Sequence, residues 1–429
     1  MTPQLFSLIF LAALATSAAL RIWLALRHLR HVAAHRNTVP AEFAERIALP
    51  SHQKAADYTQ AKIRVSLVEL AVSSVLLLAF TLGGVLQIAA DSCARFLPDH
   101  AYLSSLALFA CVAVIGFVVD LPFGLYRTFV LEARFGFNQM SWRLFLADIV
   151  KQGLLAVAIG APLLLAVLWL MTAMGAYWWL YVWMFWLVFN LLVLLLYPTL
   201  IAPIFNKFVP LDNAELKARV EALLERCGFR SSGLFVMDGS KRSAHGNAYF
   251  TGFGAAKRIV FFDTLLESLT PPEIEAVLAH ELGHYKHRHV WQRIALLALL
   301  SLAFLWLLGL LIGQPWFYAG LGVAMVPDHS LQVMPAEATQ GTAMALILFT
   351  LVLPLFTFPL APLMSRISRW HEYQADLYAA RQTHAADLIS ALVKLYRENA
   401  ATLTPDPLHS LFYDSHPPAS LRIANLKNR

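Results

Sequence analysis

The chain has 429 residues, of which 59% are hydrophobic and 14% are charged, and its mean hydropathy is +0.60. Soluble globular domains carry nearer a quarter charged residues, so this composition excludes an ordinary soluble enzyme and indicates several membrane-spanning helices. The net charge of +6 comes without a basic patch interleaved with aromatic residues, and we therefore expect no nucleic-acid partner.

Seven apolar stretches along the chain are each long enough to cross a bilayer, which takes about 20 residues of helix. They are Leu5–Leu26, Val65–Ala90, Tyr102–Phe123, Gly153–Met174, Tyr177–Ile204, Ile294–Trp316 and Ala343–Leu363. No Lys or Arg precedes the first stretch, which favours an uncleaved spanning helix over a signal peptide.

The distribution of positive charge predicts how these helices are oriented. Every Lys and Arg except Arg21 and Arg95 lies in residues 27–64, 125–151, 206–293 or 366–429, which are alternate segments between the spans. Positive residues stay on the cytoplasmic side during insertion. We therefore expect a multi-pass protein among membrane lipids, with its N-terminus outside and its C-terminus and active site in the cytoplasm. The general composition resembles that of a bacterial inner-membrane protein.

These features predict an all-α polytopic membrane protein with seven transmembrane helices and a small cytoplasmic α+β insert. Residues 1–205 would form a membrane domain with the first five spans. Residues 206–291 would form a cytoplasmic protease segment, residues 292–365 would hold the last two spans, and residues 366–429 would form a C-terminal cytoplasmic segment.

The segment 206–291 has the pattern of a small α+β unit. An amphipathic helix is expected at Leu211–Arg226, ended by Gly228, and short strands at Gly233–Asp238, Asn247–Gly254 and Arg258–Leu266. Thr270-Pro271-Pro272-Glu273 then has the form of a capping box with Pro in the first turn. The helix that begins there is expected to reach His289.

That capped helix contains an HExxH motif, His280-Glu281-Leu282-Gly283-His284. Histidines four residues apart lie on one helix face, so both imidazoles can bind one metal ion. Zinc suits imidazole ligands, and a catalytic zinc site keeps one position open for water. Glu281 is placed to take a proton from that water. The alternative is a chance occurrence of the motif.

A third metal ligand is required, and Glu372 in His371-Glu372-Tyr373-Gln374-Ala375-Asp376 is the best candidate. Glu372 and Asp376 are four residues apart, which again places them on one helix face. Glu372 would bind Zn²⁺, one ion per chain, and Asp376 would accept a hydrogen bond from a ligand imidazole. Spacing alone favours an ordinary solvated helix with acidic residues, whereas the topology supports the metal site, because both motifs fall on the same side of the membrane.

With these motifs, the sequence resembles the type I CAAX prenyl proteases, which are integral-membrane zinc metalloendopeptidases with HExxH on one helix and Glu-x-x-x-Asp on a later one. Further blocks carry the resemblance: Glu132–Asn138, Pro203–Phe208, Gly239–Tyr249, and Ser415–Pro418 followed by Arg422. The resemblance implies seven helices around an intramembrane chamber. It also implies that His416 and Arg422 stabilise the oxyanion, and that a strand at Asn247, Ala248 and Tyr249 pairs with an extended peptide substrate.

The predicted function is therefore hydrolysis of peptide bonds in extended or C-terminal, CAAX-like substrates, which can carry a lipid. Glu281 would take the proton from water and later pass it to the leaving amine. Three alternatives remain at this point: a membrane quality-control protease without prenyl specificity, a transporter or metal carrier, and an inactive chaperone. A carrier would not require Glu281, and a transporter is expected to keep ionisable groups near the midplane of its spans.

Overall fold

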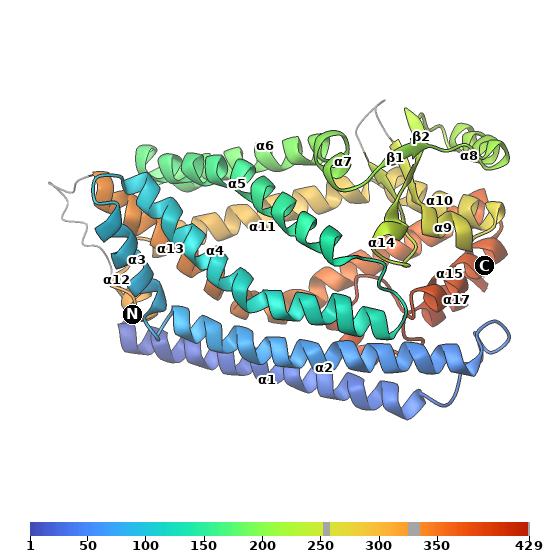
Figure 1. The fold of residues 1–429 in the computed structure, drawn as a ribbon, viewed down its shortest axis with the longest axis horizontal. Helices are drawn as coiled ribbons and strands as arrows, with labels where there is room; N and C mark the ends of the chain where they lie inside the picture. The colour runs from blue at the N-terminus through green and yellow to red at the C-terminus, as the bar shows by residue number, and fades with distance from the viewer. Residues whose placement is uncertain (252–257, 325–334, 428–429) are drawn as a thin grey trace.

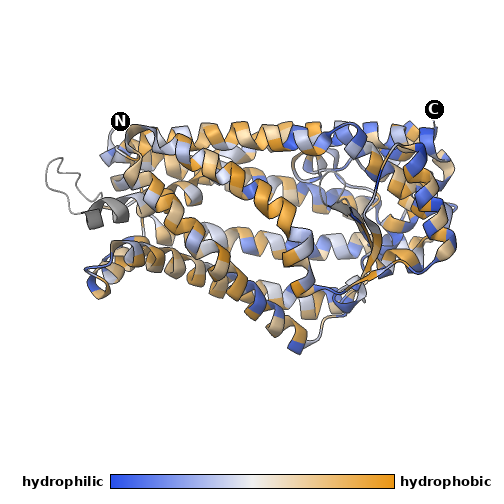
Figure 2. Cartoon of the chain, turned by 90° about the horizontal axis from the view of Figure 1, so that it is seen from above, coloured by the Kyte–Doolittle hydropathy of each residue, from blue (hydrophilic) through white to orange (hydrophobic). Residues whose placement is uncertain are grey.

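The computed structural model describes residues 1–251, 258–324 and 335–427. Long helices run along the molecule, and the sheet with its covering helices gathers at one end, beside the C-terminus; the N-terminus lies at the other end (Figure 1). Hydrophobic residues predominate along the helices and hydrophilic ones around the sheet (Figure 2). The membrane-spanning part and the polar end therefore lie at different positions along the long axis of the molecule.

Within the described residues, seven helices or helical runs are long and apolar enough to cross a membrane, as predicted. They are α1 (Pro3–His35), α2 (Leu49–Phe80), α4 (Ala101–Leu125) with the π-helix η1 (Tyr126–Glu132), α5 (Trp142–Ala173), the run η2 (Gly175–Tyr177), α6 (Trp178–Leu196), η3 (Tyr197–Ile201) and α7 (Ala202–Phe205), then α11 (His289–Leu311), and the run α13 (Pro335–Thr357), η6 (Phe358–Leu360) and α14 (Ala361–Gln382).

The second span differs from its prediction. Helix α2 ends at Phe80 instead of continuing to Ala90, and a separate helix α3 (Val85–Phe96) follows. Gly84 has a φ of 76°, a left-handed conformation that glycine adopts without steric cost. A Cβ atom at Gly83 would lie 2.8 Å from the Cα of Ala79, so this turn packs against the end of α2. Apolar residues continue through the turn, so hydropathy alone does not locate it in the sequence.

The HExxH motif lies on α10 (Pro271–Lys286), whose first turn has the predicted capping box between Thr270 and Glu273. Glu273 is buried, and it also accepts hydrogen bonds from Ser390 and Lys394. The helix ends at Lys286 rather than reaching His289, because Arg288 adopts a left-handed conformation with a φ of 57°. Helix α11 begins at His289, immediately afterwards.

Four strands form one sheet in the order β1-β2-β4-β3: β1 (Phe208–Pro210), β2 (Gly233–Met237), β3 (Ala248–Thr251) and β4 (Arg258–Phe262). The pair β2–β4 is parallel, whereas β1–β2 and β3–β4 are antiparallel. Strand β1 was not predicted, and α9 (Asp263–Ser268) replaces the end of the third predicted strand. Residues 252–254 of the second predicted strand lie outside the described residues.

Two apolar cores hold the molecule together at its two ends. At the polar end, Leu223, Phe261 and Leu282 belong to a core that joins the sheet to α8 (Ala214–Arg226), α10, α15 (Ala385–Glu398) and α17 (Ala419–Lys427). At the other end, Phe10, Leu108 and Leu348 belong to a core that includes α12 (Pro315–Ala319). The short helix α16 (Pro407–Tyr413) packs against α14. The first core fixes α10 relative to the sheet, and α10 carries the HExxH motif.

Candidate active site

The candidate site forms where α10 and α14 approach each other closely. Gly283, within the HExxH motif, lies so near α14 that a Cβ atom there would meet the Cα of Ala375 at 2.8 Å. Ala375 is itself fully buried. Because both contact positions are small, the helix that carries the two histidines lies directly against the helix that carries Glu372.

This approach brings the three predicted metal ligands together. The Nε2 atoms of His280 and His284 are 3.2 Å apart. The Oε2 atom of Glu372 lies 3.5 Å from His280 Nε2, and its Oε1 atom lies 3.2 Å from His284 Nε2. One ligand atom from each residue can be chosen so that all three lie within 4.8 Å of one another. The three side chains therefore share one point between the two helices.

The other nitrogen of His280 is fixed by a buried ion pair. Asp376 is fully buried, and its Oδ1 atom lies 2.9 Å from His280 Nδ1. Arg422, also buried, donates from Nε and Nη2 to the same carboxylate at 2.8 and 2.5 Å. With Nδ1–H donating to Asp376, the Nε2 atom of His280 has its lone pair toward Glu372 and His284.

A second chain of hydrogen bonds orients His284. His289 Nε2 lies 2.8 Å from the Oε1 atom of Gln374, and His289 Nδ1 lies 3.0 Å from His284 Nδ1. If Nε2–H of His289 donates to the amide oxygen, its Nδ1 atom is free to accept from His284 Nδ1–H. The Nε2 atom of His284 is then also unprotonated.

The donor set fits a metal ion. Two imidazole lone pairs and a carboxylate converge, and the Oε2 atom of Glu372 is buried without a hydrogen bond from the described residues, although Arg422 Nη1 lies 3.3 Å away. Burial lowers the pKa of His280, but its hydrogen bonds to Asp376 and Glu372 outweigh burial and raise the pKa to about 9, so a cation is favoured at Nε2. A bound metal ion would take the place of the Nε2 proton. The site therefore stabilises positive charge, and nitrogen and oxygen ligands of this kind suit zinc.

Glu281 and His416 lie beside the metal ligands. Glu281 is partly exposed on α10, next to His280 in the chain, and no described residue donates a hydrogen bond to its carboxylate. His416 follows α16, with its side chain 60% exposed and its Nε2 atom 3.4 Å from Glu372 Oε1. Both side chains are accessible to a bound molecule, in contrast to the buried Arg422.

Asn247, Ala248 and Tyr249 lie at the edge of the sheet. Strand β3 pairs with β4 on one side, and its other edge has no partner strand among the described residues. The carbonyl of Asn247 accepts from the backbone N–H of Phe262, and its side chain accepts from the N–H of Ala248. These hydrogen bonds belong to the sheet. The positions of Asn247, Ala248 and Tyr249 therefore depend on β3 and not on contacts with the metal ligands.

The sequence analysis gave His289 and Gln374 no role in the site. In the structure, the His289 ring stacks on the His371 ring at 3.9 Å and contacts His284. The sequence carried one signal, a further histidine soon after the HExxH motif. Only the turn at Arg288 brings that histidine back toward the site.

Comparison with known proteins agrees with this geometry. Residues 28–207 match the family described as CAAX prenyl protease N-terminal, five membrane helices, and residues 210–429 match peptidase family M48. The chain belongs to the CAAX prenyl protease family of M48 peptidases. It is 37% identical to a CAAX prenyl protease 1 homolog of Arabidopsis thaliana over 76% of this chain and 74% of the relative. It is 30% identical to the Caenorhabditis elegans homolog over 98% of both.

The fold of this M48 peptidase is also that of a solved relative. The crystal structure of S. mikatae Ste24p superimposes with a TM-score of 0.88 at 31% identity, covering 98% of both chains. The chain is therefore a multi-pass membrane metalloprotease, as predicted. Because the chain belongs to a peptidase family, the transporter or metal-carrier alternative is not favoured.

In this M48 peptidase, Gly283→Ala should separate α10 from α14. The added methyl group would overlap Ala375, and overpacking of this kind typically costs about 1–3 kcal/mol. We expect a lower thermal unfolding temperature and weaker retention of metal, measured by calorimetry and metal analysis. Gly116→Ala on α4, where an added Cβ meets nothing within 4 Å, is the matched control. Equal behaviour of the two variants would contradict the close approach.

Proposed function

We propose that this membrane metalloprotease is a zinc endopeptidase that cleaves prenylated, CAAX-like C-terminal segments of peptides or proteins. The observation that carries the proposal is the convergence of His280, His284 and Glu372 from two helices, with Glu281 beside them. The relatives are CAAX prenyl proteases by name, which supports the choice of substrate. The quality-control alternative differs only in having no preference for the prenyl group.

The roles of the side chains follow from their contacts. Zinc bound by this set would act as a Lewis acid toward the scissile carbonyl and would make water nucleophilic at neutral pH. Glu281 accepts the proton of the attacking water and returns it to the leaving amine. His416, exposed and next to Glu372, donates a hydrogen bond to the developing oxyanion.

Arg422 and Asp376 act mainly through the ligands. The Asp376 carboxylate, held by two hydrogen bonds from Arg422, accepts the Nδ1–H of His280. The Nη1 atom of Arg422 adds positive charge 3.3 Å from Glu372. His289 and Gln374 hold His284 in the corresponding way. Outer partners of this kind fix the tautomer and the ring orientation of metal-binding histidines. The oxyanion role that the resemblance implies for Arg422 would require its buried guanidinium to reach the substrate as well.

The substrate is proposed to bind as an added strand along β3, which presents Asn247, Ala248 and Tyr249 at the sheet edge. We also propose the intramembrane chamber, the division into four segments, the bacterial inner membrane and the cytoplasmic position of the site. The concentration of Lys and Arg in alternate segments supports the orientation.

The test uses purified protein in lipid vesicles and one peptide sequence ending in Cys-aliphatic-aliphatic-X, either farnesylated or unmodified. We expect one zinc ion per chain, loss of cleavage after a chelator removes it, and recovery when zinc is returned. The farnesylated peptide should be cleaved with the higher kcat/KM. Chelator-resistant cleavage would overturn the metal assignment, and equal rates on both peptides would favour the quality-control alternative.

A further inference from the structure

The loop between β2 and β3, residues 238–247, contacts both the sheet end of the molecule and the membrane helices. On the sheet side, the Thr264 hydroxyl of α9 donates to the His245 carbonyl at 3.1 Å, and the N–H of Ser240 donates to Asp263 Oδ1 at 2.9 Å. The loop leads directly into β3, and β3 contacts α10. The position of the loop therefore affects how the edge strand meets the helix that carries the HExxH motif.

Arg242 holds this loop against the membrane helices through four hydrogen bonds. Its Nε and Nη2 atoms donate to the Asp148 carboxylate on α5 at 2.8 and 3.0 Å. Its Nη1 atom donates to Asn206 Oδ1 at 2.6 Å, and Nη2 also donates to the Phe205 carbonyl at 2.8 Å. Asp148 is buried, so its charge is neutralised inside the protein by a residue of the loop. A buried ionisable group in a membrane helix is costly, and its partner points to its function.

Two further parts of the chain enclose the loop. The N–H of Ala244 donates to the Phe137 carbonyl at 3.2 Å, shortly after the π-helix η1. The N–H of Lys207 donates to Asp238 Oδ1 at 2.8 Å, shortly after α7. Phe137 and Lys207 belong to sequence blocks that carry the family resemblance but contribute nothing to the metal group. The structure brings both blocks against the loop that precedes β3.

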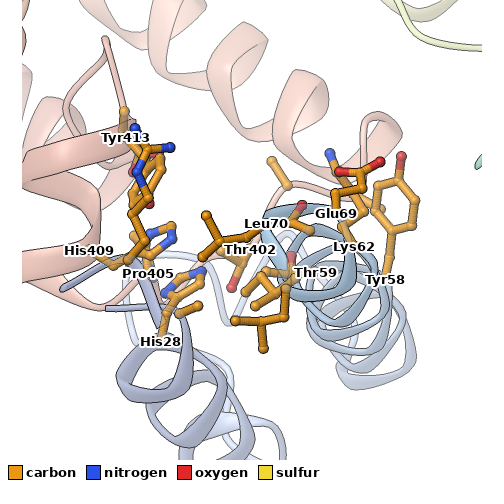
Figure 3. A pocket seen from close by; sticks show the side chains of 18 of the residues that line it. His28, Tyr58, Thr59, Lys62, Glu69, Leu70, Thr402, Pro405, His409 and Tyr413 are labelled. Atoms are coloured by element: carbon orange, nitrogen blue, oxygen red, sulfur yellow. The ribbon is translucent and has the colours of Figure 1, made fainter. Parts of the chain in front are cut away.

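His245 provides a second attachment, close to the start of β3. Its Nδ1 atom lies 3.1 Å from Asn399 Oδ1, and its Nε2 atom lies 3.6 Å from Glu132 Oε2. The Glu132 carboxylate also accepts a hydrogen bond from the Tyr58 hydroxyl. Tyr58 and Asn399 line a cavity between α1, α2 and the segment after α15, and Figure 3 shows Tyr58 beside Lys62 on the α2 side. His245 is therefore held between the third span and the segment after α15.

We propose that Arg242 and His245 are positioning residues, which fix the start of β3 so that a peptide added along its edge presents one particular bond to the metal group. The inference rests on the proposed function and specifies what determines the cleavage position. Among the described residues, neither side chain forms a hydrogen bond or ion pair with a metal ligand, so both act through the loop. A misplacement of about 1 Å far from the chemistry can lower a rate about 10²-fold.

The experiment uses the full chain in lipid vesicles and identifies the cleaved bond of a farnesylated peptide by mass spectrometry. Wild-type enzyme should cut one bond. Arg242→Met and His245→Ala should each lower kcat/KM, by as much as about 10²-fold, and should yield products cut at a neighbouring bond. Zinc content should stay at the wild-type value, because the metal ligands lie on α10 and α14.

A double variant separates positioning from stability. Arg242→Met alone leaves Asp148 buried without its partner, which destabilises the fold. Asp148→Leu with Arg242→Met buries no unpaired charge, so the unfolding temperature should recover, whereas the single cleavage position should not. Arg226→Met is the matched control, because it breaks the ion pair of Arg226 with Glu275, which joins α8 to α10 and does not involve the loop. This control should cut only the wild-type bond.

The cleavage position decides the outcome. If the folded double variant cuts only the wild-type bond, at whatever rate, the inference is overturned and the proposed function stands. Loss of zinc from the folded variants would also overturn it, because the loop would then act on the metal group and not on the substrate. Failure of the wild-type enzyme to cleave the peptide would reject both proposals.

Discussion

Replacing Glu281 by Gln is expected to lower kcat by about 10²–10⁴-fold, the usual contribution of general acid–base catalysis. The amide has nearly the same shape as the carboxylate but cannot accept the proton of the attacking water. Glu281 is partly exposed and has no hydrogen bond to the described residues, so its replacement should not disturb α10. Single-turnover cleavage of a farnesylated peptide, with zinc content measured in parallel, checks this.

Glu275→Gln is the matched control for this variant. Glu275 lies on the same helix, but its carboxylate pairs with Arg226 at 2.9 Å, away from the metal group. We expect Glu275→Gln to retain normal turnover and Glu281→Gln to retain normal zinc content and thermal stability. Full turnover by Glu281→Gln would remove the proton-transfer role from that residue.

Asp376→Ala is expected to damage both stability and metal binding. It would leave the guanidinium of Arg422 buried without its partner, and breaking a buried pair in this way costs about 3–5 kcal/mol. It would also remove the acceptor for His280 Nδ1–H, and loss of such an outer partner typically weakens metal binding about 10–100-fold. Thermal unfolding and zinc competition with a chelator measure the two effects.

A double variant, Asp376→Leu with Arg422→Met, separates these two effects. Apolar side chains of similar volume should restore much of the stability, because no charge remains buried. Zinc affinity should stay low, because His280 still lacks its acceptor. Recovery of zinc affinity together with stability would show that Asp376 only neutralises Arg422 and does not orient the imidazole.

The parts of the fold that depend on local sequence were predictable. Spanning helices follow from apolar length, and the start of α10 follows from the capping box between Thr270 and Glu273. Spacing within each motif also placed His280 with His284, and Glu372 with Asp376, on common helix faces. The packing of α10 against α14 depends on tertiary contacts and could not be predicted from local sequence. The only local indication of it was Gly283, a small residue within the motif.

Features set by backbone conformation or by distant partners were not predictable from local pattern. The turn after α2 depends on Gly84 within apolar sequence, and the end of α10 depends on a left-handed Arg288. The contact of Asp376 with Arg422 joins residues far apart in the chain, and the resemblance named Arg422 without revealing this partner. His289 was not identified as a partner of His284, because their contact forms across the break between α10 and α11.

The third metal ligand is carried by the same helical run as the seventh span. That run extends over Gly341–Gln382, and its 42 residues correspond to about 60 Å of helix, roughly twice the thickness of a bilayer's hydrocarbon layer. The two imidazoles are on α10, which the break at Arg288 separates from its neighbouring span. The close contact of Gly283 with Ala375 joins α10 to this run, so the imidazoles and the carboxylate are both positioned by the seventh span.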